Sequence, residues 1–325
     1  MAEIVKDGIL IREVETSSIM TKSSLPVGGY SVNPYVGCTH GCKYCYASFM
    51  KRFTGHTEPW GTFLDVKHWP AIRNPQKYAG QRVVIGSVTD GYLPQEEQFG
   101  NTRKLLEQLR GSGAEILICT KSDLVVRDID LLKELGKVTV SWSVNTLDEG
   151  FKDDMDNAVS IARRLDAMKR VYDAGIRTVC FISPVFPGIT DFEAIFHRVR
   201  AQCDLVWLEN LNLRGSFKKV ILDYIREKRP DLVPLYDAIY SKGDRSYFRA
   251  LERQAERLAK AYGCPFVDNE LPYGAGGAGA SGHSGLFLPR RGPRHGKQRG
   301  PQSLNPRSAP MADAHSAHPK KGPQP

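Results

Sequence analysis

The chain has 325 residues, of which 41% are hydrophobic and 25% charged, a composition typical of a globular protein with one large domain or two ordinary ones. The formal net charge of +9 belongs mostly to residues 275–325, which carry eight basic side chains and one acidic one, so it does not indicate a phosphate-binding groove on the rest of the chain. The sequence has no apolar run of the roughly 18 residues that a membrane span needs and no secretory signal, which predicts a cytoplasmic protein without a membrane segment, with its cysteines reduced.

Short apolar segments predict the strands of the fold. Residues 1–25 are interpreted as an N-terminal lead-in, and a first strand is predicted near Tyr30–Val36. Five continuous apolar runs follow, at residues 82–88, 114–120, 138–144, 176–182 and 204–210. Such runs are typical of strands that are buried on both faces of a parallel sheet.

Amphipathic stretches lie between these runs. Apolar side chains recur at helical spacing from Ile161, from Phe192 and from Phe217, and a further helix is predicted over residues 247–262. The alternation of strands and helices predicts an α/β fold with about six β/α units. Its parallel sheet is either doubly wound or curled into a barrel, and in both cases the active site lies at the carboxyl ends of the strands.

The strongest local signal is the segment GCTHGCKYCYA, which has three cysteines in Cys-x3-Cys-x2-Cys spacing. The thiolates of Cys38, Cys42 and Cys45 can together hold one soft metal centre. A closed [4Fe–4S] cluster takes four thiolates, so three leave one iron with an open position for chemistry. The alternative is a structural zinc site with His40 or the distant Cys264 as the fourth ligand. The protein would then be a non-enzymatic module that binds nucleic acid through its basic tail.

The longer segment NPYVGCTHGCKYCYA resembles the cluster loop of the radical S-adenosylmethionine (SAM) superfamily, especially the branch around spore photoproduct lyase. The order of motifs over residues 8 to about 274 is most similar to the radical SAM mobile pair proteins, which are encoded beside a second radical SAM protein. The resemblance implies a partial (β/α)6 TIM-like barrel over residues 26–240, with the cluster at the C-terminal ends of the strands, and a helical extension over residues 241–274.

The same resemblance implies the chemistry. Three cysteines would hold a [4Fe–4S] cluster whose fourth iron binds the amino and carboxylate groups of SAM. One-electron reduction would then cleave SAM to a 5′-deoxyadenosyl radical, which removes a hydrogen atom from a substrate. In this interpretation the protein supplies binding, orientation and exclusion of water.

Candidate SAM-binding residues begin at the cluster loop. Tyr44 and Tyr46 flank the third cysteine, where an aromatic ring can stack near the adenine or simply pack the loop. Ser87, Thr89 and Asp90 follow the strand at residues 82–88. The resemblance implies that this position binds the SAM amine, and the alternative is capping of the next helix.

Further candidates follow the next strands. Lys121 shares a strand face with Cys119, and the resemblance to the lyase branch implies that it pairs with the SAM carboxylate. Ser143 and Asn145 share a strand face and are within reach of the ribose. Arg163 is a second candidate for the carboxylate, although such a residue is more often part of a solvated helix face.

The substrate is left open between a nucleic-acid lyase or repair enzyme and an enzyme that modifies another molecule. The resemblance implies that the thymine-dimer lyase returns a hydrogen atom from a cysteine on the strand after the cluster, and residues 82–92 contain no cysteine. Tyr46 and Cys119 are the candidate hydrogen donors, although Cys119 also suits a buried structural role. The expected partners are an electron donor such as flavodoxin or ferredoxin and a second radical SAM protein.

Residues 275–325 differ in composition from the rest. They contain nine Gly, eight Pro and four His and show neither a helical nor a strand period. This composition cannot bury enough apolar surface to offset chain entropy, so a disordered basic tail is predicted. The irregular spacing of the histidines favours a solvated tail over a metal-binding tract.

Overall fold

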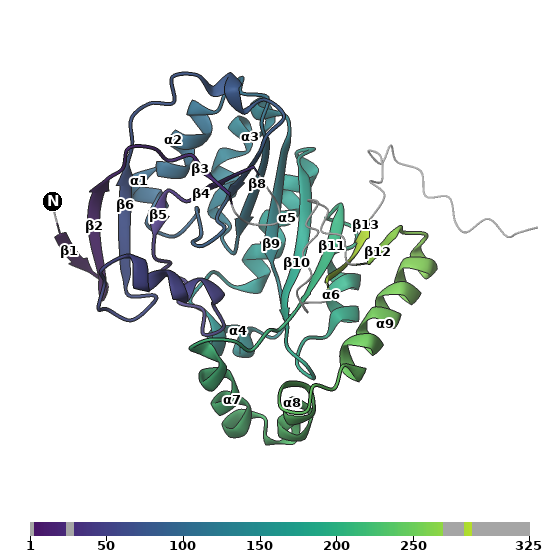
Figure 1. Cartoon of the computed structure of the whole chain (residues 1–325). Helices are drawn as coiled ribbons and strands as arrows, with labels where there is room; N and C mark the ends of the chain where they lie inside the picture. The colour runs from purple at the N-terminus through teal and green to yellow at the C-terminus, as the bar shows by residue number, and fades with distance from the viewer. Residues whose placement is uncertain (1–2, 24–28, 269–282, 288–325) are drawn as a thin grey trace, which may run out of the picture. The chain divides into compact units, whose positions relative to one another are not determined.

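The computed structural model describes residues 3–23, 29–268 and 283–287 (Figure 1). Its main sheet contains a row of parallel strands in the order β4, β7, β8, β9, β10 and β11. Their bounds are Tyr30–Val32, Arg82–Ile85, Glu115–Thr120, Val138–Ser143, Arg177–Val185 and Leu205–Asn210. The five apolar runs correspond to the last five of these strands, so the predicted α/β fold with a parallel sheet is confirmed.

Helices cover one face of this sheet (Figure 1). Buried side chains of that face, such as Ile118 on β8 and Val140 on β9, belong to one hydrophobic core with Leu165 and Met168 of α5. The helices that contribute to this core are α2 (Asn101–Gln108), α3 (Ile129–Leu135), α5 (Ile161–Asp173), α6 (Phe192–Val199) and α9 (Ser246–Tyr262). The apolar stripes predicted α5, α6 and α9, because each stripe becomes the face that packs on the sheet, whereas no stripe was identified for α2 and α3.

The opposite face of the sheet is lined differently. Side chains alternate along a strand, so the residues between the core positions point away from the helices. On β8 and β9 these are Leu117, Cys119, Ser141 and Ser143, which line a cavity and do not belong to the helix-packed core. The sheet therefore separates a packed side, which stabilises the fold, from a side that is available for a ligand.

The described chain has further short helices around this sheet. They are α1 (Glu96–Phe99), α4 (Glu149–Met155), α7 (Phe217–Lys228), α8 (Val233–Tyr240) and the 3-10 helices η1 (Tyr46–Phe53), η2 (Pro75–Tyr78), η3 (Leu124–Asp128) and η4 (Pro230–Leu232). Helix α7 confirms the stripe from Phe217, with Ile221 and Ile225 buried. None of the described helices is long and apolar enough to cross a membrane.

A second sheet at the N-terminal side was not anticipated. Its order is β1 (Glu3–Lys6), β2 (Ile9–Glu15), β6 (Phe63–His68) and β5 (Tyr35–Val36). The strand predicted near Tyr30–Val36 is therefore divided between two sheets. Pro34, which lacks a backbone N–H, separates the two parts.

The C-terminal part of the described chain corrects the prediction of a tail that packs on nothing. Strand β13 (His283–Phe287) pairs antiparallel with β11 and with β12 (Phe266–Asp268). The prediction of disorder is therefore wrong for these five residues, and for the rest of residues 275–325 it lies outside the described part of the chain. At the other end β3 (Thr21–Lys22) pairs with β4, so the described sheet is open rather than a closed barrel.

Candidate functional site

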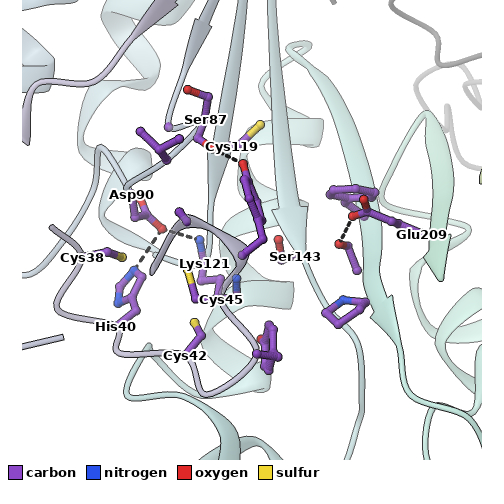
Figure 2. A pocket seen from close by; sticks show the side chains of 18 of the residues that line it. Cys38, His40, Cys42, Cys45, Ser87, Asp90, Cys119, Lys121, Ser143 and Glu209 are labelled. Carbon is purple, nitrogen blue, oxygen red and sulfur yellow. Dashed lines mark hydrogen bonds and ion pairs between the residues drawn. The ribbon is translucent and has the colours of Figure 1, made fainter. Parts of the chain in front are cut away.

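A cavity of ≈ 700 Å³ lies at the carboxyl ends of the parallel strands, beside the loop that carries the three cysteines (Figure 2). Most of the predicted site residues line it: Cys38, Cys42, Tyr44, Cys45, Tyr46, Ser87, Thr89, Asp90, Cys119, Lys121 and Ser143. Asn145 and Arg163 are not among its lining residues. The cavity thus brings together residues from separate parts of the sequence, while their individual contacts with SAM stay predictions.

The three cysteines lie on consecutive tight turns of one loop. The N–H of Gly41 donates to the Cys38 carbonyl at 3.1 Å, and the N–H of Cys45 donates to the Cys42 carbonyl at 3.1 Å. Burial raises the pKa of Cys38 and Cys45, and it raises the pKa of Cys42 to about 12 although the charge of Lys121 opposes the shift. In the absence of metal these thiols are therefore neutral, and binding a metal centre releases their protons.

Backbone contacts fix this loop against its neighbours. The Lys43 N–H donates to the Met155 carbonyl at 2.9 Å, and the Asn157 N–H donates to the His40 carbonyl at 2.8 Å. A Cβ on Gly61 would lie 2.9 Å from the Gly41 Cα, so a side chain at Gly61 would push against the turn between the first two cysteines. The loop is therefore held by hydrogen bonds and by close packing at a glycine.

The carboxylate of Asp90 joins the cysteine loop to strand β8. It lies 2.9 Å from His40 Nε2, and it accepts hydrogen bonds from the Thr120 hydroxyl at 2.9 Å, the Lys121 N–H at 2.7 Å and the Tyr92 N–H at 2.8 Å. Burial would raise the pKa of Asp90, but His40 and the backbone N–H groups of Lys121 and Tyr92 lower it below the usual value. The sequence suggested that Asp90 binds the SAM amine, yet both carboxylate oxygens already have protein partners. We therefore infer that Asp90 positions the cysteine loop.

The other two candidates of the same segment also contact the cysteine loop or its flanks. The Thr89 hydroxyl donates to the carbonyl of Gly37, which precedes the first cysteine. The Ser87 carbonyl accepts a hydrogen bond from the Tyr46 hydroxyl, and the Ser87 hydroxyl bonds that of Ser31. The polar groups after β7 therefore hold the cysteine loop in place through hydrogen bonds. The sequence pattern did not indicate this role.

Lys121 lies at the end of β8, beside the cysteines (Figure 2). Its Nζ is 5.6 Å from the centre of the Tyr44 ring, within the range of a cation–π interaction. Burial lowers the pKa of Lys121, but Cys42, once it is a thiolate, and the Asp156 carboxylate more than offset this, so the pKa of Lys121 lies above the ordinary value. The side chain is therefore a permanent positive charge in the cavity.

Neither Arg163, which the sequence suggested, nor its neighbour Arg164 lines the cavity, but Arg164 supports the cysteine loop. Arg163 is exposed and pairs with Asp123 at 2.7 Å. The next residue, Arg164, is fully buried, pairs with Asp156 at 2.7 Å and donates to the Ser143 carbonyl. Asp156 in turn accepts a hydrogen bond from the Tyr44 hydroxyl at 3.1 Å, so the Arg164–Asp156 pair supports the cysteine loop through Tyr44.

The wall of the cavity opposite the cysteines was not predicted. Glu209 at the end of β11 accepts a hydrogen bond from the Ser183 hydroxyl, and it lies across the cavity from Cys38 (Figure 2). Phe181 and Trp207 line the same wall. Alternation along the run at residues 204–210 places Trp207 and Glu209 on one face, so this signal was present in the sequence but was not used.

The donor set fits an iron–sulfur cluster better than a single zinc ion. A structural zinc needs a fourth ligand beside the three cysteines. Of the proposed fourth ligands, His40 bonds Asp90, and Cys264 belongs to the helix-packed core. Near the cysteines, His40 Nδ1 and Trp60 Nε1 are buried and have no hydrogen-bond partner among the described residues, as expected where an acceptor such as a cluster is to bind.

Comparisons with known proteins agree with this site. The Radical SAM superfamily matches residues 32–199. An uncharacterized protein of Methanocaldococcus jannaschii is 32% identical over 224 residues, which cover 69% of this chain and 85% of the relative. A Pseudomonas phage M6 protein named radical SAM Nalpha-GlyT isomerase is 27% identical over 195 residues, or 59% of this chain and 38% of that protein.

The fold also has a counterpart among solved structures. A double mutant of spore photoproduct lyase with bound AdoMet and dinucleoside spore photoproduct aligns with a TM-score of 0.51 and 16% identity, over 67% of each chain. At this identity the likeness concerns the fold and not the substrate.

Proposed function

The chain belongs to the radical SAM superfamily, and we propose that it holds a [4Fe–4S] cluster through Cys38, Cys42 and Cys45 and acts as a radical SAM enzyme. When bound, the cluster and SAM supply reductive cleavage of SAM and removal of a hydrogen atom from a substrate. The observation that carries the proposal is that three free thiols of one loop, Cys38 buried and Cys42 and Cys45 partly buried, line a cavity of ≈ 700 Å³. Three thiolates leave one iron of the cluster open for SAM.

The protein's own residues bind and orient SAM in this proposal. The ammonium of Lys121 pairs with the SAM carboxylate, because it is a charged side chain beside the cysteines. Tyr44 and Tyr46 offer ring surface to the adenine, and the Ser143 hydroxyl is available to the ribose. Asn145 and Arg163 are left out of this assignment, because neither lines the cavity.

The hydrogen donor and the partners also belong to the proposal. Cys119 and Tyr46 line the cavity, and burial raises the pKa of the Cys119 thiol to about 12, which keeps its hydrogen in place. Enzymes of this chemistry need a one-electron donor, for which a flavodoxin or ferredoxin is suited. A second radical SAM protein is the partner that the resemblance to the mobile pair proteins suggests.

A nucleic-acid substrate is the second candidate. Tyr46, Phe49 and Phe53 of η1 are exposed, and the Arg52 guanidinium lies over the Phe49 and Phe53 rings at 5.3 and 4.7 Å. Exposed aromatic rings with a basic side chain favour stacking with nucleotide bases.

The cluster is tested by anaerobic reconstitution with iron and sulfide. We expect a brown protein with bound iron, because three thiolates and the unpartnered N–H of Trp60 suit a sulfur-rich cluster. A colourless protein that binds zinc instead would contradict the assignment and would favour a structural metal site.

Replacement of Lys121 by Ala is expected to weaken SAM binding while the cluster still assembles. The change removes a charge partner of the SAM carboxylate, which is worth about 1.5–3 kcal/mol or roughly a 10- to 100-fold rise in Kd. Equilibrium dialysis of SAM with the reconstituted protein measures the effect. Lys43→Ala is the control, because it removes an exposed positive charge of the same loop that does not line the cavity. Equal SAM affinity of the Lys121→Ala protein and the wild type would remove Lys121 from the site.

A further inference from the structure

The cavity wall opposite the cysteines is built from the ends of β10 and β11. Phe181 on β10 and Trp207 on β11 are partners in the register of the parallel sheet, and both line the cavity. The register is irregular near the end of β10, where the Ser183 hydroxyl donates a hydrogen bond to the Glu209 carboxylate at 2.5 Å. Irregularities of this kind re-aim side chains at the edge of a site. The wall therefore combines two aromatic rings with one carboxylate that is held in place.

The charge of Glu209 is not balanced by a protein cation. Its side chain is partly buried and lines the cavity. Among the described residues, Ser183 is the only hydrogen-bond partner of this carboxylate, and no basic side chain forms an ion pair with it. Arg214 lines the same cavity but does not form an ion pair with any of the described side chains either. Such a carboxylate favours a ligand that brings its own donor, and most of all one that carries a positive charge.

The position of this wall separates it from the proposed SAM contacts. Lys121 and Tyr44 lie together beside the cysteines, with 5.6 Å between the ammonium and the ring centre. Glu209 lies across the cavity from Cys38 (Figure 2). The hydrogen atom is taken from a group on the far side of SAM from the cluster, so the substrate is expected against this wall.

We propose that Glu209 binds a protonated amine of the substrate, and that Phe181 and Trp207 pack against the carbon atoms that carry this amine. The proposal rests on the proposed function and names the substrate class for the same cavity. A carboxylate pairs with an ammonium through charge-assisted hydrogen bonds, and aromatic rings attract a cation over their faces. The same carboxylate repels a phosphate, so this wall favours an amine over the backbone of a nucleic acid.

The test measures the binding of benzylammonium chloride and of its neutral counterpart, benzyl alcohol, to the reconstituted protein with bound SAM, by isothermal titration calorimetry at neutral pH. We expect the wild type to bind benzylammonium about tenfold more tightly, which corresponds to one charged hydrogen bond. Glu209→Gln keeps the shape of the side chain and removes its charge, so it is expected to lose this preference without a change in the Kd of SAM. Glu209→Asp keeps the charge and is expected to retain part of the preference.

Glu115→Gln is the matched control. Glu115 is exposed at the start of β8, at the opposite end of the sheet, and does not line the cavity. The substitution removes the same charge and is expected to leave the preference for benzylammonium unchanged.

Three results would decide against parts of the account. Equal affinity of the wild type for the two probes, or an unchanged preference in Glu209→Gln, would overturn the inference and leave the proposed function standing. The comparison of the two probes in the wild type needs no variant, so it decides the question even if Glu209→Gln does not fold. Weaker SAM binding by a folded Glu209→Gln would also overturn the inference, because Glu209 would then belong to the SAM site. A wild type that prefers benzylammonium but forms no 5′-deoxyadenosine from SAM would instead contradict the proposed function.

Discussion

Cys42→Ala is expected to lose the cluster. Cys42 is the middle ligand of the loop and lies between two tight turns, so the remaining two thiolates cannot hold the same centre. Loss of a residue that only hydrogen-bonds a metal ligand already lowers metal affinity about 10- to 100-fold, and loss of a ligand itself is expected to lower it further. Bound iron and visible absorbance after anaerobic reconstitution measure the effect, and Cys38→Ala and Cys45→Ala are expected to behave in the same way.

Cys203→Ala is the matched control for these variants. Cys203 is buried, and its thiol donates to the Val199 carbonyl at 3.4 Å on the helix-packed side of the sheet. This variant is expected to bind as much iron as the wild type. Wild-type iron content in Cys42→Ala would show that other residues hold the metal.

Arg164→Met is expected to lower the free energy of unfolding by about 3–5 kcal/mol, the range found when one partner of a buried ion pair is removed. The substitution leaves the Asp156 carboxylate buried and without its guanidinium partner, which lies at 2.7 Å. Lys152 Nζ at 3.9 Å offers only partial compensation. Because Asp156 also accepts from the Tyr44 hydroxyl, the cysteine loop is expected to loosen as well.

The neighbouring Arg163→Met provides the comparison, measured by unfolding both variants in urea. Arg163 pairs with Asp123 at the surface, where such a pair is worth about 0–1 kcal/mol. A similar small loss for both variants would mean that the Arg164–Asp156 pair does not support the fold.

The parallel strands and the cysteine loop were predictable from the sequence for physical reasons. Strands buried on both faces leave continuous apolar runs, and helices that pack on a sheet leave apolar stripes at helical spacing. The cysteines lie within one short segment, so their proximity can be predicted without knowing the fold. Lys121 was selected because strand alternation places it on the face of Cys119 and because the segment resembles the lyase branch at this position.

Other features depend on tertiary contacts that no local pattern encodes. Asp90 follows a strand, as a ligand-binding residue would. Its carboxylate oxygens, however, are hydrogen-bonded to His40, to Thr120 and to two backbone N–H groups. The inward position of Arg164 is different, because Arg164 lies three residues after Ile161 on the apolar stripe of α5, a signal that was present in the sequence but was not used.

The remaining differences come from pairing over long distances. Strands β2 and β6 pair although many residues separate them, and β13 pairs with β11 from a segment whose composition predicts no strand. Such pairing depends on which strand edge is available in the fold, and it cannot be predicted from the composition of the segment.

The central claim is tested most directly by incubating the reduced, reconstituted protein with SAM and measuring 5′-deoxyadenosine. We predict slow formation of 5′-deoxyadenosine even without substrate, and none from Cys38→Ala, Cys42→Ala or Cys45→Ala. The assay needs no knowledge of the substrate, because it reports on the cluster, the SAM site and the class of reaction together. A protein that binds three to four irons but forms no 5′-deoxyadenosine with a strong reductant would contradict the account and would leave the cluster a structural role.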